Sequence, residues 1–143
     1  MRSETLHATL VFVGKIEQTR LTALHQAAGE IASANFSVCF DTARYWGHNH
    51  IIYAAPSQVP SPLLQLVAAL EKSLMRHHVK FDAHEYKAHV TLLRNAHWTD
   101  RALPNMAPAS WQVREFVLVQ SLRQAEGTAY QVLARFPLRA SEA

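Results

Sequence analysis

The stretches His7-Ala8-Thr9-Leu10 and His89-Val90-Thr91-Leu92 are near copies of each other, and each lies in a short apolar run typical of a β-strand. Alternate residues of a strand point to the same face, so the histidine and the threonine of each copy lie side by side. The repetition predicts a fold with two similar halves. If the two strands meet, two imidazoles and two hydroxyls face one small anionic group, an arrangement suited to acid/base chemistry on a phosphate.

This prediction depends on the motif occurring twice. A shuffled chain of this composition contains roughly 0.5 His-x-Thr triplets, so one copy is uninformative. Requiring a following leucine lowers the expectation to roughly 0.06, and two independent copies are expected at about 0.002 per chain. We therefore interpret His7 and His89 as a functional pair.

Length and composition favour one soluble domain covering residues 1–143, with 49% hydrophobic and 17% charged residues. The formal net charge is only +3, but ten of the fourteen cationic residues are arginine, which suits contacts with phosphate. Cys39 is the single cysteine, so an intrachain disulfide is excluded and a reducing compartment is favoured. With no secretory pattern and no run of 18 apolar residues, we expect a cytoplasmic protein that does not span a membrane.

Hydrophobic periodicity and turn residues predict the elements. In chain order we first expect a strand at 6–13 and a helix from Thr19 to about Ala34. Strands at 36–41 and 51–54 follow, joined as a hairpin through a turn at 47–50, and then a helix that begins at Ser61-Pro62 and ends at Arg76-His77-His78. The last elements are a strand at 88–94 and strands at 113–119 and 129–136, which are joined by a turn at 126–128. Two helices cannot cover a doubly wound parallel sheet. We therefore predict an α+β fold of largely antiparallel sheets around a central cleft, with the helices outside.

The residues around the repeats narrow the interpretation. The segments Leu6–Gly14, Tyr45-Trp46 and Tyr86–Arg94 resemble those of the 2H phosphoesterase superfamily, and in particular its RNA 2′,3′-cyclic phosphodiesterases, also called 2′-5′ RNA ligases, of the LigT/ThpR type. The resemblance covers essentially the whole chain. It implies a two-lobed, pseudo-symmetric fold and hydrolysis of RNA 2′,3′-cyclic phosphate ends to 2′-phosphates, with reversible 2′-5′ joining in some members and neither metal nor cofactor.

The resemblance also implies a role for each matching residue. His7 would protonate the leaving 3′ oxygen and His89 would activate the attacking water. Thr9 and Thr91 would donate hydrogen bonds to phosphate oxygens, and Arg94 would neutralise the charge that develops on them. Tyr86 would line the nucleotide pocket, and no residue is assigned to a metal.

One departure from the family concerns the start of the chain. Relatives usually carry a further strand and helix before the first motif, whereas here His7 comes almost at once. Without that unit we expect an exposed sheet edge, so the protein is expected to be a monomer or a homodimer formed through that edge.

Two other functions stay open from the sequence. One is a noncatalytic module that binds RNA ends or nucleotides. The other is a cyclic phosphodiesterase acting on small nucleotides such as ADP-ribose cyclic phosphate. A metalloprotease site at His84-Glu85 and His89 is rejected, because the second histidine comes five residues after the first rather than four. Trp46, Trp98 and Trp111 could stack on bases, although a packing role is the more common one.

Overall fold

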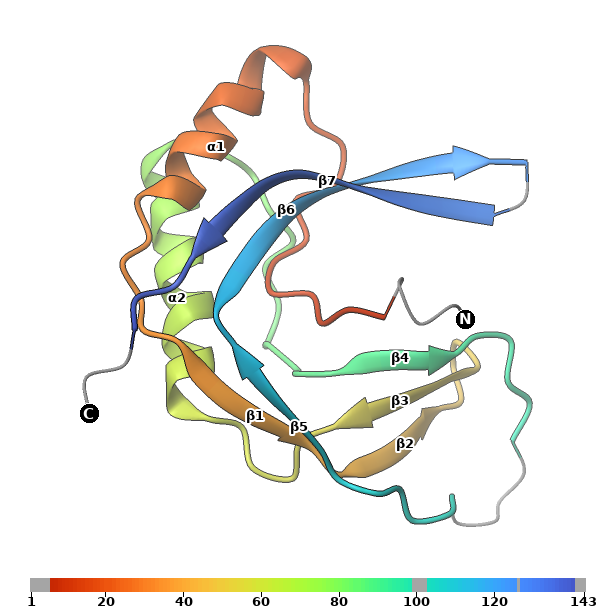
Figure 1. Cartoon of the computed structure of the whole chain (residues 1–143). Helices are drawn as coiled ribbons and strands as arrows, with labels where there is room; N and C mark the ends of the chain where they lie inside the picture. The colour runs from red at the N-terminus through yellow and green to blue at the C-terminus, as the bar shows by residue number, and fades with distance from the viewer. Residues whose placement is uncertain (1–5, 99–102, 126, 141–143) are drawn as a thin grey trace.

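The computed structural model describes residues 6–98, 103–125 and 127–140 and confirms the α+β class (Figure 1). A 3-10 turn (Gln18–Arg20) leads into helix α1 (Leu21–Gly29), and a second helix is α2 (Ser61–Arg76). The strands are β1 (Phe36–Phe40), β2 (Thr42–Trp46), β3 (Ile51–Ala55), β4 (Val90–Leu93), β5 (Ala109–Val113), β6 (Glu115–Gln124) and β7 (Gly127–Pro137).

The named strands form three antiparallel sheets, β1–β5, β2–β3–β4 and β6–β7. The predicted hairpin between 36–41 and 51–54 is wrong, because β3 pairs with β2 and β1 pairs with β5. Asp41 separates the two sheets. Its carboxylate accepts hydrogen bonds from the backbone N–H (2.8 Å) and hydroxyl (2.6 Å) of Ser57, and its own N–H donates to Ala55. These bonds fix the point where the chain leaves one sheet for the next.

The predicted first strand is also wrong as a regular element. Of residues 6–13, only Ala8 makes a ladder contact, an isolated antiparallel bridge to Val90. The backbone bends at Leu10, and Gly14 adopts a φ of +78°, so the pairing does not continue. Figure 1 shows this segment running between β4 and the β6–β7 hairpin.

The remaining strand predictions need smaller changes. Strand β4 is shorter than the expected 88–94, and the expected strand at 113–119 is divided between β5 and β6. Strand β7 extends beyond both ends of the expected 129–136. Of the predicted turn at 126–128, residue 126 lies outside the described residues, and Gly127 has a φ of +115°, a conformation that favours glycine.

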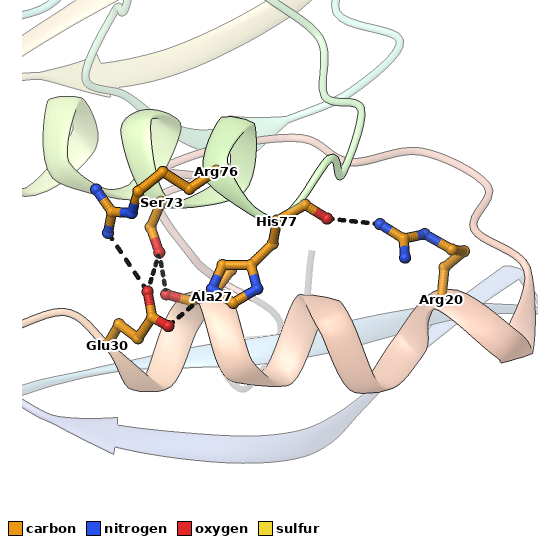
Figure 2. Close-up of polar contacts among 6 residues, drawn as sticks. All are labelled: Arg20, Ala27, Glu30, Ser73, Arg76 and His77. Atoms are coloured by element: carbon orange, nitrogen blue, oxygen red, sulfur yellow. Dashed lines mark hydrogen bonds and ion pairs between the residues drawn. The ribbon is translucent and has the colours of Figure 1, made fainter.

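The two helices pack against each other beside the sheets (Figure 1). Helix α2 confirms its prediction, except that Pro60 rather than Ser61 is the N-cap residue. Helix α1 ends at Gly29, five residues earlier than expected. Figure 2 shows the polar contacts between the two helices and the residues that follow them. The Glu30 carboxylate lies 2.8 Å from Nε2 of His77 and 3.4 Å from the guanidinium of Arg76.

The core lies between the helices and the sheets. Leu63, Leu66, Val67 and Leu70 of α2 pack against the buried face of β1, formed by Phe36, Val38 and Phe40. A smaller cluster joins Leu24 and Ala27 of α1 to Leu74 and Val79. In the described part of the chain, neither helix has the length and apolarity needed to cross a bilayer.

Candidate active site

The bridge between Ala8 and Val90 brings the two His-x-Thr motifs together. If this antiparallel register is extended by one residue in each direction, His7 is expected opposite Thr91 and Thr9 opposite His89. In that register Ala8 and Val90 share the other side, so the four motif side chains are expected on one face. Sequence reasoning predicted this convergence, and the bridge gives its register.

His89 lies against an aromatic wall built by β2 and β3. Its ring centroid is 4.9 Å from that of Trp46 and 5.8 Å from that of Tyr53, in both cases edge-on. Trp46 in turn stacks on Tyr53 at 3.9 Å. Burial raises the pKa of the Tyr53 phenol above its ordinary value of 10, and the phenol is uncharged near pH 7. The imidazole therefore has an uncharged, fixed surface behind it.

A hydrogen bond sets the tautomer of His89. Its Nδ1 lies 2.8 Å from the carbonyl oxygen of Lys87, and a carbonyl can only accept, so Nδ1 carries the proton. In the neutral ring the lone pair is then on Nε2. His89 is therefore arranged to accept a proton at Nε2.

His7 has a different neighbour. Its side chain is exposed, and its ring lies 5.1 Å from that of Tyr130 on β7. The β6–β7 hairpin thus flanks His7 while the β2–β3–β4 sheet flanks His89. The two imidazoles are approached by different elements of the fold.

The two threonines differ in their surroundings. Thr91 pairs with Tyr53 across β3 and β4 and is only 9% exposed, whereas Thr9 is exposed. Thr91 therefore lies at the base of the shared face and Thr9 at its rim. Both carry a hydroxyl that can donate to an anionic oxygen.

Arg94 follows a break in the β3–β4 ladder. Tyr53 pairs with Thr91 and Ile52 with Leu93, which leaves Leu92 as an extra residue. A bulge of this kind changes which face the following residues point to. Arg94 itself lies in a bend directly after the end of β4. The arginine side chain itself is exposed.

Tyr86, the predicted nucleotide-binding residue, is partly buried. Its side chain packs against the main core cluster, and its hydroxyl is buried with no hydrogen-bond partner among the described residues. Burial raises the pKa of Tyr86 to about 12. Tyr86 packs against the core and is not among the residues that line the cavity at His89, and its predicted role in nucleotide binding stays a prediction.

A cavity of about 340 Å³ opens beside His89. It is lined by Trp46, His84, Glu85, Lys87 and His89. Sequence reasoning gave Trp46 only an alternative stacking role and did not select His84, Glu85 or Lys87. Lys87 precedes His89 by only two positions in the sequence.

Outside this site, the described part of the chain has a second cavity but no cluster of ligand side chains for a metal ion. A second cavity of about 360 Å³, which includes Cys39, Asp41 and Ser57 in its lining, contains none of the motif residues. Across the described residues, no group of three or more histidine, cysteine, aspartate or glutamate side chains is placed to hold a metal ion.

Comparison with known proteins gives consistent matches. The family model described as the 2′-5′ RNA ligase superfamily matches residues 1–125. The RNA 2′,3′-cyclic phosphodiesterase of Escherichia coli (strain K12) is 29% identical over 136 residues, which cover 95% of this chain and 77% of that protein.

Solved structures agree with the sequence matches. The apo structure of E. coli LigT superposes with a TM-score of 0.87 at 29% identity, covering 97% of this chain and 79% of that one. A structure described as a phosphoesterase gives a TM-score of 0.85 at 30% identity, over 94% and 78% of the two chains. The TT0787 protein of Thermus thermophilus, at 22% identity, a TM-score of 0.77 and coverage of 99% and 82%, shares the fold.

Proposed function

The chain belongs to the 2′-5′ RNA ligase superfamily, and we propose that it is an RNA 2′,3′-cyclic phosphodiesterase that works without a metal ion. The Ala8–Val90 bridge carries the proposal, because it unites two His-x-Thr motifs that are far apart in the sequence. The E. coli relative is named for this activity. E. coli LigT has also been crystallised with phosphate and with 3′-AMP.

In the proposed reaction, His89 and His7 act on opposite sides of the phosphorus atom. The Nε2 atom of His89 takes a proton from a water molecule as the water oxygen forms a bond to phosphorus. The bond from phosphorus to the 3′ oxygen breaks, and that oxygen receives a proton from His7. The product carries a 2′-phosphate and a free 3′-hydroxyl.

The charge that develops on the phosphate oxygens needs fixed donors. We assign two of them to the hydroxyls of Thr9 and Thr91, each of which follows a motif histidine by two residues. Arg94 supplies a guanidinium, which pairs with phosphate oxygens in a bidentate geometry. We assign RNA ends as the substrate class.

The proposal is tested with an oligoribonucleotide that ends in a 2′,3′-cyclic phosphate, incubated in EDTA, with the 2′-phosphate product separated by chromatography. The wild-type protein should form this product. His7→Ala and His89→Ala should each lower the rate by about 10² to 10⁴.

His25→Ala is the matched control, since His25 lies on α1 away from the motifs and its loss should leave the rate unchanged. Circular dichroism establishes that each variant is folded. A folded wild-type protein that forms no product, or histidine variants that keep the full rate, would show the proposal to be wrong.

A further inference from the structure

The cavity beside His89 is next to only one of the two motif histidines. His89 and Lys87 line it, whereas His7, whose ring lies beside Tyr130, does not. In a displacement at phosphorus, the incoming and outgoing oxygens lie on opposite sides. If His89 takes the proton from the oxygen that attacks phosphorus, a group attached to that oxygen would extend into this cavity.

The size and lining of the cavity fit a nucleoside. Small-molecule sites start at about 300 Å³, so a volume of about 340 Å³ accommodates one compact ligand. One face of Trp46 is covered by Tyr53, and the half-buried indole also forms part of the cavity wall. A flat indole held in this way is suited to stacking on a nucleobase.

The charges in the lining also favour a nucleoside over a second phosphate. Lys87 contributes a positive charge, but the carboxylate of Glu85 lines the same cavity and repels an anion. Glu85 can instead accept hydrogen bonds from the amino or imino groups of a base or from ribose hydroxyls. His84 adds a further hydrogen-bonding group at this wall.

We propose that this cavity is the subsite for a second nucleoside, the one whose 5′ oxygen joins the phosphate, with Trp46 as its stacking platform. This inference rests on the proposed function. In the joining direction, the 5′-hydroxyl gives its proton to His89 as its oxygen bonds to phosphorus. The bond to the 3′ oxygen breaks, and that oxygen takes a proton from His7, which leaves a 2′-5′ linkage. Cleavage is the reverse, and neither direction needs another reactant.

The test compares two substrates that differ only in the second base. One is adenylyl-2′,5′-adenosine, and the other is its analogue with an abasic ribose on the 5′ side. We expect wild-type kcat/KM for cleavage to be at least about 10-fold higher with the base present. In Trp46→Ala this ratio should fall to about 2 or less, whereas Trp46→Phe, which keeps a flat ring, should retain most of it.

Trp111→Ala is the matched control, because Trp111 is an exposed tryptophan on β5 and outside the cavity, and it should keep the wild-type ratio. A wild-type ratio near one, an unchanged ratio in Trp46→Ala, or no cleavage of either dinucleotide would overturn the subsite. Adenosine 2′,3′-cyclic phosphate is assayed in parallel. If it is hydrolysed while the subsite test fails, the proposed function stands without the subsite, and if nothing is hydrolysed, both are wrong.

Discussion

The hydroxyl of Tyr45 on β2 donates a hydrogen bond of 2.8 Å to the carbonyl oxygen of Ala96, 51 positions later. The Ala96 N–H donates to the carbonyl of His50, also at 2.8 Å, and His50 Nδ1 lies 3.0 Å from the Tyr45 hydroxyl. The segment after β4 is therefore clamped to the β2–β3 turn. Arg94 lies two residues before this clamp.

Tyr45→Phe tests whether the clamp positions Arg94. The variant keeps the ring but removes the bond to the Ala96 carbonyl, which should lower the free energy of unfolding by about 1 kcal/mol. It should also reduce kcat several-fold by loosening the segment that carries Arg94. Urea unfolding and steady-state kinetics measure the two effects. In an Arg94→Ala background, Tyr45→Phe should have no further effect on kcat, and additive losses would contradict the positioning role.

Arg94→Ala should lower kcat by about 10² to 10³, the usual cost of losing one donor to a developing anion. Arg94→Lys should recover only part of this loss, because an ammonium keeps the charge but cannot make a bidentate contact. Kinetics with a cyclic phosphate substrate provide the measurement. Arg76, an exposed arginine at the end of α2, gives the control Arg76→Ala. If Arg94→Ala and the control are equally active, Arg94 does not contribute to catalysis.

Local patterns predicted the elements that bury one regular face. Helix α2 was predicted because Leu63, Leu66, Val67 and Leu70 recur at helical spacing and all are buried. Strand β2 was missed because its residues are all intermediate or exposed, so no alternation marks it. The partner of β1 could not be read locally, since β5 follows it by some seventy residues and the pairing depends on Asp41 turning the chain.

In the site too, local patterns predicted some residues, and others are brought in by contacts between distant segments. The repeated motif selected His7, Thr9, His89 and Thr91, because the expected strands set each histidine beside its threonine. The first copy forms no regular strand, and a single bridge from Ala8 to Val90 joins the two copies. Trp46 and Tyr130 reach the imidazoles through tertiary packing, for which the sequence has no periodic signal. Tyr86 illustrates the opposite case, since a residue close to the motif in sequence packs into the core.

Thr91→Val should separate catalysis from packing. Valine has nearly the shape of threonine, so a side chain that is 9% exposed should still pack, and the unfolding midpoint should change little. Loss of a hydrogen bond to a charged phosphate, about 1.5 to 3 kcal/mol, should lower kcat/KM by about 10- to 150-fold. Thr91→Ser should restore most of the activity because it restores the hydroxyl. Thr22→Val on exposed α1 surface is the control. Full activity in Thr91→Val would exclude a phosphate contact.

Glu30 gives the link between α1 and α2 a defined pH dependence. The hydrogen bond from His77, aided by Arg76 and Ser73, lowers the pKa of Glu30 from its ordinary value of 4.5. A carboxyl group with a lowered folded-state pKa stabilises the fold above its unfolded pKa, and this contribution disappears as pH falls through the lowered value.

Glu30→Gln should therefore lower the free energy of unfolding at pH 7, measured by urea titration. The difference from wild type should shrink as the pH is taken from 4.5 to below the lowered pKa, where wild-type Glu30 is itself protonated. Glu17→Gln serves as the control, because Glu17 lies before the 3-10 turn and makes no side-chain cap bond there. If Glu30→Gln lowers the free energy of unfolding by the same amount at pH 7 and below the lowered pKa, the charge of the Glu30 carboxylate does not stabilise the contact between the helices.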